Sequence, residues 1–391
     1  MTYWLKDTTS PTSQNSKPKD SSILIIGSGI TGVSVAYFLL KEKYSDIALV
    51  DCGTENASYF RNAGHILHGA CENYKAMSSI HGREKTKTIF QLSQQFCEQI
   101  KDTINTQNLD CDYHQGNYLV LPSNQKERQE LADSTIMMDE DGFSSSHIIS
   151  NPEEYGFKSN FAKVCTLSAQ ANPTKFRNQL LQQINSSISY HSYKVKSINE
   201  VSNRVEVTYF DDTKSYHDAL VIAANVYSPL FSEFFSSRKL VEPFRGQIIV
   251  SKPLTHPTKR MQFSLDHGYV YGTTTIDNRF LIGGWRNNVT DQEVGSYELT
   301  INPLIEEGLK QFTKDNTIFT DLEWDYSWSG IMGSSNTGFP HIGPTNSPII
   351  FTCAGCTGYG FGWFHGSAKM LVDIMSGNAL PAGYNYFNPN K

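Results

Sequence analysis

The chain has 391 residues, of which 39% are hydrophobic and 18% charged, and its formal net charge is −6. This length exceeds the size at which one hydrophobic core usually stops growing, so two lobes are expected. An acidic chain lacks the basic footprint that nucleic-acid binding needs, and no apolar run approaches the length of a transmembrane helix.

Residues 1–20 are predicted to form a polar N-terminal arm, because they hold no apolar core of signal-peptide length. The seven cysteines are odd in number and scattered, which fits reduced thiols better than a disulfide framework. Cys353 and Cys356 form a CxxC pair, but no second pair accompanies them, so no metal site is predicted. These features together favour a cytoplasmic location.

A nucleotide-binding unit is predicted directly after the arm. A short apolar strand ends at the motif GSGITG (27–32), a helix follows, and a second strand ends in Asp51. In such a unit the glycines allow a tight turn, close approach of a pyrophosphate and close helix–strand packing. The N–H groups at the start of the helix point at the phosphates. A carboxylate at Asp51 suits a ribose diol and disfavours NADP.

Helices and strands alternate along the middle of the chain. Apolar residues recur every three or four positions over 84–108, which predicts an amphipathic helix. Paired strands with a turn at Ser202–Asn203 are predicted over 189–210. Further helices are predicted over 124–133, 174–184 and 366–377, and further strands over 116–123, 218–225, 246–251, 268–274, 279–285 and 348–355.

Two later features favour FAD over NAD as the nucleotide. The stretch 353–374 is a second glycine-rich strand-to-helix turn. Such a turn can present N–H groups and a helix dipole to the O2/N1 edge of a flavin, where negative charge builds on reduction. The strand within 218–228 can bring its end back beside the adenosine site. A single NAD site would need neither feature.

Signals of the nucleotide-binding domain therefore occur at the start, the middle and the end of the chain. We expect an α/β fold in which a Rossmann-like FAD-binding domain is interleaved with an α+β substrate domain built on a mostly antiparallel sheet. The FAD-binding domain is predicted over 21–75, 151–242 and 326–391, and the substrate domain mostly over 76–150 and 243–325.

These landmarks resemble the D-amino-acid-oxidase-like (DAO) family of FAD oxidoreductases, which includes glycine and sarcosine oxidases and bacterial amine oxidases. The matching stretches run over nearly the whole chain, and their order and spacing carry the resemblance. They are ILIIGSGITGVSVAYFL, SYFRNAGH, CDYHQGNYLVL, ANPTKF, VIAANVYSPL, FRGQII, FLIGGW, WSGIMGSSNTGFPHIG and the C-terminal glycine-rich helix start.

The resemblance implies that the stretch ASYFRNAGHILHG (57–69) runs along the flavin ring. Its small residues would let backbone groups reach flavin heteroatoms, and Arg61 or His65 could stabilise the charge of the reduced flavin. Val195 would contact the adenine, and Ala224 would mark a strand end near the pyrophosphate. The cofactor-binding candidates are Gly27, Gly29, Ile30, Thr31, Gly32, Asp51, Ser58, Arg61, Asn62, Ala63, Gly64, His65, Val195, Ala224, Gly333, Gly358, Tyr359, Gly360 and Phe361.

Departures from the family pattern concern the substrate. Members that bind an amino-acid carboxylate often carry an arginine in the WSGIMGSSNTGFPHIG region or a lysine where Gly362 stands, and this chain has neither. A carboxylate would need Arg245 or Arg286, or else the substrate is an amine or a larger N-substituted compound. Loss of Arg286 should cost about tenfold to hundredfold in kcat/KM if it binds a carboxylate. It should cost less than about fivefold if it is solvated, as arginines that begin loops usually are.

The resemblance implies oxidation of the C–N bond of an amine or amino acid by hydride transfer to flavin N5, followed by hydrolysis of the imine in water. The partner expected is therefore a small-molecule amine or amino acid. Two alternatives stay open: a flavin dehydrogenase that passes electrons to an acceptor other than oxygen, and a non-catalytic FAD-binding subunit. The catalytic candidates are His65, Arg61, Tyr271 and Arg286.

FAD is predicted to be bound non-covalently. Relatives with a covalent flavin use a histidine just before the Ala-Gly step, where Arg61 and Asn62 stand here, or a cysteine near the position of Ser329 and Gly330. None of these four residues is a suitable nucleophile. Acid precipitation of the purified protein should leave the yellow flavin in the supernatant, and yellow colour retained in the pellet would contradict this prediction.

Overall fold

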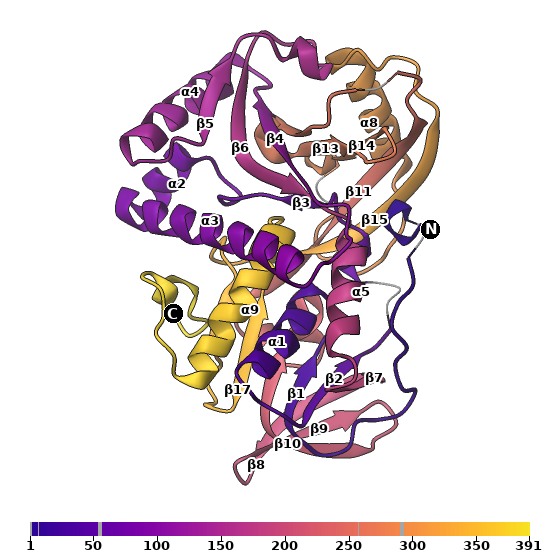
Figure 1. The fold of residues 1–391 in the computed structure, drawn as a ribbon, viewed down its shortest axis with the longest axis vertical. Coiled ribbons are helices and arrows are strands. Elements are labelled where there is room, and N and C mark those ends of the chain that lie inside the picture. The colour runs from indigo at the N-terminus through magenta and orange to yellow at the C-terminus, as the bar shows by residue number, and fades with distance from the viewer. Residues whose placement is uncertain (1, 7, 54–56, 257, 290–292) are drawn as a thin grey trace.

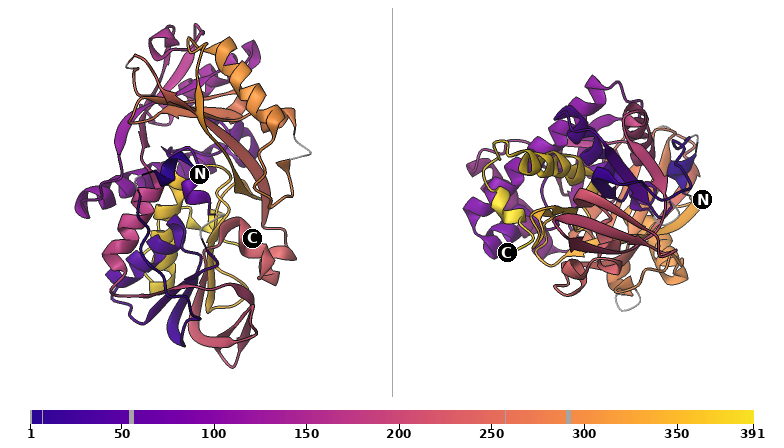
Figure 2. Two further views of the ribbon diagram at one scale, coloured as in Figure 1. Left: turned by 90° about the vertical axis from the view of Figure 1, so that its right-hand side faces the viewer. Right: turned by 90° about the horizontal axis from the view of Figure 1, so that it is seen from below.

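The computed structural model describes residues 2–6, 8–53, 57–256, 258–289 and 293–391 of the chain. Two lobes are stacked along the long axis of the molecule, as Figure 1 and the turned view in Figure 2 show. The lower lobe in Figure 1 is built on a sheet with a parallel centre, and the upper lobe on a mostly antiparallel sheet. The predicted fold class is confirmed.

The lower sheet carries the nucleotide-binding unit. Its strands follow the spatial order β16 (His341–Pro344), β17 (Ile350–Ala354), β10 (Lys214–Ile222), β1 (Ser21–Ile26), β2 (Ile47–Asp51) and β7 (Ser189–Ser192). The five strands from β17 to β7 are parallel, and β16 is antiparallel to β17. A hairpin of β8 (Val195–Val201) and β9 (Arg204–Tyr209) continues from β10.

The central strands are buried on both faces, so they are continuously apolar instead of alternating. On β1, Ile23 and Ile25 belong to the large core under the helices, whereas Leu24 and Ile26 belong to a second core on the other side. The helices on the first face are α1 (Ile30–Lys41), α5 (Pro173–Ile184) and α9 (Gly360–Ser376), and α1 packs between the other two.

The upper sheet contains nine strands in the described part of the chain. Only the pair β12–β4 is parallel there. The strands follow the order β15 (Trp324–Ser335), β11 (Val241–Pro253), β14 (Arg279–Gly284), β13 (Val270–Thr274), β12 (Gln262–Leu265), β4 (His114–Leu121), β6 (Ala162–Gln170) and β3 (His65–Ile66), with β5 (Ser146–Ile149) beside β6.

The helix predicted over 84–108 is α3 (Arg83–Thr106), and it packs on α9 of the lower lobe. Its apolar stripe, which includes Ile89, Phe96 and Ile100, is buried. Long strands β11 and β15 pair along their length and also extend toward the lower lobe in Figure 1. The remaining helices are α2 (Tyr74–His81), α4 (Gln125–Glu140), α6 (Glu233–Ser236) and α8 (Pro303–Asn316).

The chain enters the upper sheet inside all three segments that were predicted for the FAD-binding domain, and β15 is the strand in the third of them. Strand β3 follows β2 by only a short stretch, and β6 lies just before α5. Strands β3 and β6 pair with each other in the upper sheet. The segment after β2 therefore leaves the lower sheet at once and lies between the lobes. The exact domain boundaries stay a prediction.

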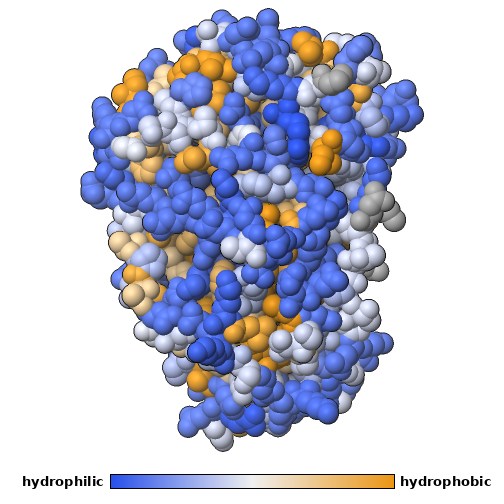
Figure 3. Space-filling model, viewed as in Figure 1, coloured by the Kyte–Doolittle hydropathy of each residue, from blue (hydrophilic) through white to orange (hydrophobic). Residues whose placement is uncertain are grey.

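The surface shown in Figure 3 is mainly hydrophilic, with apolar patches scattered over it. Among the helices of the described residues, none has both the length and the apolar character that crossing a bilayer requires. The scattered apolar side chains on this surface are normal for a folded protein and need no special explanation.

The first residues of the chain pack into the molecule, although their composition is that of a polar arm. Trp4 is only 3% exposed, and its indole N–H donates a hydrogen bond of 2.6 Å to the carbonyl oxygen of Asn62. The Tyr3 hydroxyl donates to Asp277 at 2.6 Å, and Lys6 forms an ion pair with the same carboxylate. The N-terminal segment therefore joins the upper lobe to the stretch between the lobes.

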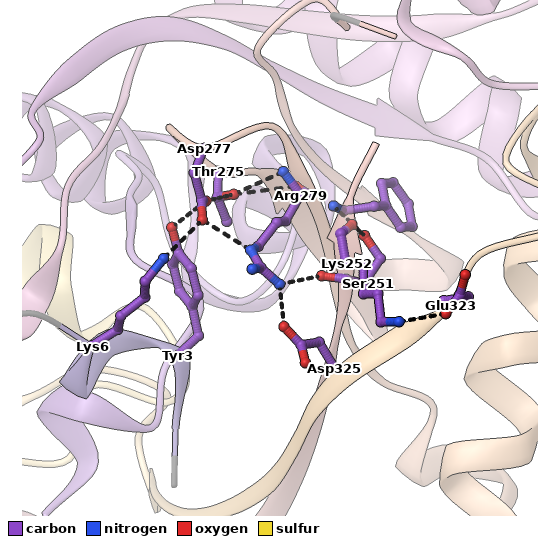
Figure 4. Close-up of polar contacts among 10 residues, drawn as sticks. Tyr3, Lys6, Ser251, Lys252, Thr275, Asp277, Arg279, Glu323 and Asp325 are labelled. Carbon is purple, nitrogen blue, oxygen red and sulfur yellow. Dashed lines mark hydrogen bonds and ion pairs between the residues drawn. The ribbon is translucent and has the colours of Figure 1, made fainter. Parts of the chain in front are cut away.

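The Asp277 carboxylate, which accepts the hydrogen bond from Tyr3, belongs to a larger polar network (Figure 4). Arg279 of β14 donates to Asp277 at 2.9 Å and to Asp325 of β15 at 2.6 Å. Further along, Asn178 of α5 donates to the carbonyl oxygen of Thr9. The N-terminal segment thus contacts both lobes through specific hydrogen bonds.

The buried Trp4 yields a stability prediction. Trp4→Ala should lower the free energy of unfolding by about 3 kcal/mol, because it leaves a cavity against the inter-lobe segment. Trp4→Phe should cost only about 1 kcal/mol, because it keeps the ring and loses one hydrogen bond. Urea unfolding followed by near-UV circular dichroism measures both. Phe210→Ala, at a 58% exposed ring, is the control, and equal midpoints for all three variants would contradict the prediction.

Candidate FAD and substrate site

The turn between β1 and α1 has the geometry of a phosphate-binding loop. Gly27 has a φ of +106°, and a Cβ on Gly32 would stand 1.7 Å from the Gly27 carbonyl oxygen. Both positions therefore require glycine. A Cβ on Gly29 would meet nothing within 4 Å, so this residue faces open space. Helix α1 begins at Ile30 with no side-chain cap, which leaves its first N–H groups free for an anion.

Asp51 lies beside this loop at the end of β2. Its Oδ2 accepts the Ser28 N–H at 2.6 Å, and its Oδ1 accepts the Gly53 N–H at 3.1 Å. The Asp51 carbonyl oxygen accepts the Tyr193 N–H at 2.7 Å, two residues before Val195. The segment that leads into β8 and Val195 is therefore hydrogen-bonded at Tyr193 to the predicted acidic residue.

The strand end at Ala224 also meets the loop. The N–H of Ala223 donates to the Ile26 carbonyl oxygen, and a Cβ on Gly27 would stand 2.6 Å from the Ala223 carbonyl oxygen. The three strand ends β1, β2 and β10 thus converge at the carboxyl edge of the sheet, where open α/β sheets bind ligands.

The segment 57–65 is held in shape by its own asparagine. Asn62 Oδ1 accepts the Gly64 N–H at 2.8 Å, and the Asn62 amide nitrogen donates to the carbonyl oxygens of Ser58 and Tyr59. Gly64 has a φ of +75° and lies against Trp4, so a side chain there would clash. The polar residues of the segment are therefore used to fix its backbone.

Arg61 points from this segment toward the upper sheet. Its Nη1 donates to the Ser329 carbonyl oxygen at 2.7 Å, and Trp328 donates its indole N–H to the Arg61 carbonyl oxygen at 3.0 Å. A Cβ on Gly330 would stand 2.9 Å from the Arg61 Cβ. Arg61 therefore joins the segment to β15.

His65 is neutral in this environment. Burial lowers the pKa of its imidazole to about 4, and its Nε2 lies 3.0 Å from the Gly272 carbonyl oxygen. A carbonyl oxygen can only accept, so Nε2 carries the proton and Nδ1 keeps the lone pair. The rings of Tyr118 and Tyr271 are 6.2 and 6.4 Å from the imidazole ring. His65 therefore belongs to an aromatic, weakly polar wall.

The C-terminal glycine-rich turn lies on the other side of the segment 57–69. A Cβ on Gly362 would stand 2.3 Å from the Leu67 carbonyl oxygen, so the start of α9 touches that segment directly. Gly358 has a φ of +90° and faces open space. The Thr357 N–H donates to the Gly333 carbonyl oxygen at 3.1 Å, and the Gly355 N–H donates to Asn225 Oδ1 at 2.9 Å. Helix α9 also begins without a side-chain cap.

Three tyrosines lie next to the segment 57–69: Tyr118, Tyr271 and Tyr359. Tyr118 and Tyr359 pack with Leu67, and burial raises the pKa of both hydroxyls. Burial raises the pKa of Tyr271 to about 12, while the nearby charge of Arg286 opposes this rise. These hydroxyls are therefore protonated at neutral pH and can donate hydrogen bonds.

The two arginines that could bind a substrate carboxylate, Arg245 and Arg286, differ in the partners of their guanidinium groups. Arg245 forms a buried ion pair with Glu293, with Nε at 2.6 Å and Nη2 at 3.0 Å from its two oxygens. Arg286 lies over the rings of Phe244 and Tyr269, at 4.5 and 5.2 Å from their centroids. No carboxylate of the described residues lies within ion-pair distance of Arg286. Arg245 is therefore already neutralised, whereas Arg286 is not.

A model of the FAD-dependent oxidoreductase family named DAO matches residues 22–374. The chain belongs to this family. Its cofactor is FAD, and the family membership that the sequence landmarks indicated is confirmed.

Individual relatives of the DAO-family chain are distant. A D-amino acid dehydrogenase from Sinorhizobium medicae (strain WSM419) is 26% identical over 163 residues, which span 42% of this chain and 38% of the relative. Glycine oxidase from Geobacillus kaustophilus has a TM-score of 0.77 at 16% identity, covering 95% of this chain and 98% of that one. L-Proline dehydrogenase from P. horikoshii has a TM-score of 0.75 at 16% identity, with the same coverage. These structural similarities show a shared fold.

The site of this DAO-family chain fits FAD on its own geometry. Two of the glycines that face open space, Gly29 and Gly358, stand at the starts of two uncapped helices. Uncapped N–H groups are donors that a bound diphosphate or a flavin oxygen can satisfy. That the predicted residues on both loops, on the segment 57–65 and at the ends of β2 and β10 bind FAD stays a prediction.

Three residues that contact the predicted site residues were not themselves predicted: Trp4, Tyr118 and Arg177. Arg177 had a sequence signal: it lies on the apolar stripe of α5, four residues before the buried Leu181. A cation on a buried stripe requires specific partners. Trp4 had only the weak signal of one tryptophan in a polar segment, and Tyr118 is placed by the pairing of β4 with β12, which no local pattern shows.

Gly29→Val should abolish FAD binding while the protein still folds. Nothing lies within 4 Å of a Cβ at this position, so the valine fits the protein but occupies the space where the diphosphate approaches. The flavin-to-protein absorbance ratio of the purified variant measures the loss, and circular dichroism checks the fold. A folded variant with the flavin content of the wild type would disprove the assignment of the loop.

Proposed function

We propose that this protein oxidises the C–N bond of an amino acid at the site between its lobes. Bound FAD supplies the hydride acceptor for this chemistry. The family membership and the names of the relatives, which act on D-amino acids, glycine and L-proline, support an amino-acid substrate.

The unpaired charge of Arg286 is the observation that carries the choice of an amino acid over a simple amine. This guanidinium lies over the Tyr269 ring, its charge lowers the pKa of Tyr271, and the ring centroids of Tyr271 and His65 are 6.4 Å apart. A carboxylate at this place would receive a charge-assisted hydrogen bond from Arg286. Arg245 does not compete for it, because Glu293 already occupies its donors.

The same wall orients the rest of the substrate and holds water away. Tyr118, Tyr271 and Tyr359 present aromatic surface and protonated hydroxyls, and none of them is a base at neutral pH. His65 keeps a lone pair on Nδ1 but is a weak base, since burial lowers the pKa of the imidazole to about 4. The substrate amine must therefore arrive neutral or lose its proton to water.

Three groups of residues would contact the three parts of FAD: the diphosphate, the adenosine and the flavin ring. The loop Gly27–Gly32 and Ala224 hold the diphosphate, while Asp51 and Val195 hold the adenosine. Ser58–His65 lie along the flavin ring. Gly333 and Gly358–Phe361 would lie at its O2/N1 edge, where the dipole of α9 would stabilise negative charge.

The reduced flavin can pass its electrons to oxygen or to another acceptor. The relatives include an oxidase and two dehydrogenases by name, so an oxygen electrode and a dye-reduction assay should be run together. We further propose a cytoplasmic protein, because all seven cysteines are free thiols and five of them are buried.

Arg286→Met tests the proposed substrate. It should lower kcat/KM by about tenfold to hundredfold on the best amino acid, which is the value of a charge-assisted hydrogen bond in a dry site. The matching decarboxylated amine should lose less than about threefold in kcat/KM. Arg204→Met, at a half-exposed arginine on β9, is the control. A loss below fivefold on every amino acid would instead show an amine substrate.

A further inference from the structure

Arg177 of α5 is completely buried, with no exposed surface. Helix α5 lies beside α1 in the lower lobe (Figure 1). The next most buried arginines among the described residues, Arg245 and Arg279, each pair with carboxylates. Arg177 differs from them, because no described carboxylate lies within ion-pair distance of its guanidinium.

The guanidinium is instead bonded to the phosphate-binding loop. Its Nε donates to the Ser28 carbonyl oxygen at 2.7 Å, and its Nη2 donates to the Ser28 Oγ at 2.8 Å. Nη2 also donates to the Tyr190 hydroxyl at 3.1 Å, and Nη1 donates to Asn178 Oδ1 at 2.9 Å. The rings of Tyr59 and Tyr190 stand 5.1 and 5.7 Å from the guanidinium carbon.

All of these acceptors are neutral, so they solvate the charge without balancing it. An arginine does not lose its proton in a protein, and a buried charge without a counter-charge is costly. The nearest acidic group in this chain of hydrogen bonds is Asp51, which accepts the Ser28 N–H from the other side of the same residue. Ser28 therefore separates the guanidinium from Asp51 and stands between Gly27 and Gly29.

We propose that Arg177 is a positioning residue of the FAD site, and that the FAD diphosphate balances its buried charge. Two hydrogen bonds to Ser28 hold the loop in the shape that admits the diphosphate. The positive charge behind the loop attracts this anion through a region of low dielectric constant, where electrostatic interactions are strong. This role concerns the cofactor alone and holds whichever amine or amino acid is oxidised.

The test compares ligands with and without phosphates on protein stripped of its flavin. FAD, ADP and adenosine are titrated into the wild type, Arg177→Gln and the control Arg204→Gln. Arg177→Gln should weaken FAD and ADP binding by at least about tenfold and change adenosine binding by less than about threefold. Arg204→Gln should leave all three dissociation constants within about twofold.

Two results would overturn the proposal. One is an FAD dissociation constant of Arg177→Gln within about threefold of the wild type. The other is an equal loss of ADP and adenosine affinity, because that loss would come from a collapsed loop and not from charge. Arg177→Lys keeps the charge and serves as the second variant if Arg177→Gln does not fold. It should keep the preference for ADP over adenosine within about threefold, and a tenfold loss of that preference would equally overturn the proposal.

Discussion

Close approach between backbones is the constraint on which the FAD site depends. Helix α1 can start at the end of β1 only because Gly32 lies against the Gly27 carbonyl oxygen, and α9 can touch the segment 57–69 only because Gly362 has no side chain. Both helices begin without a side-chain cap, so their first N–H groups are available to a ligand. A Cβ at either contact would displace a helix start, so the position of these helix starts and the direction of their dipoles have the same origin.

The charges around the site are arranged so that few of them are free. Glu293 neutralises Arg245, the carbonyl oxygen of Ser329 accepts from Arg61, and burial keeps His65 neutral. Arg286, like Arg177, has no described carboxylate within ion-pair distance, but Arg286 is partly exposed and contacts two aromatic rings. The missing family arginine and lysine therefore do not decide the substrate, since another element can supply the cation.

The sequence predicted the nucleotide-binding loop, Asp51, the helix α3 and the two interleaved sheets, because each depends on a local pattern of glycines, strand ends or helical periodicity. It did not predict the packing of Trp4 or the pairing of β3 with β6, since both join residues far apart in the chain. It also could not separate Arg245 from Arg286: the difference between them is a partner 48 residues away, Glu293, whose contact depends on the tertiary fold.

The N-terminal segment shows what composition alone does not reveal about a polar stretch of chain. Its polar residues bond to α5 and to the network around Asp277, while its two aromatic rings are buried. Trp4 supports the segment 57–65 from behind, and α5 supports the phosphate loop through Arg177. Each of these contacts contributes little by itself, but the contacts join segments that meet only when both lobes are folded. The stability of the cofactor loops is thereby tied to the stability of the whole molecule instead of to their own few contacts.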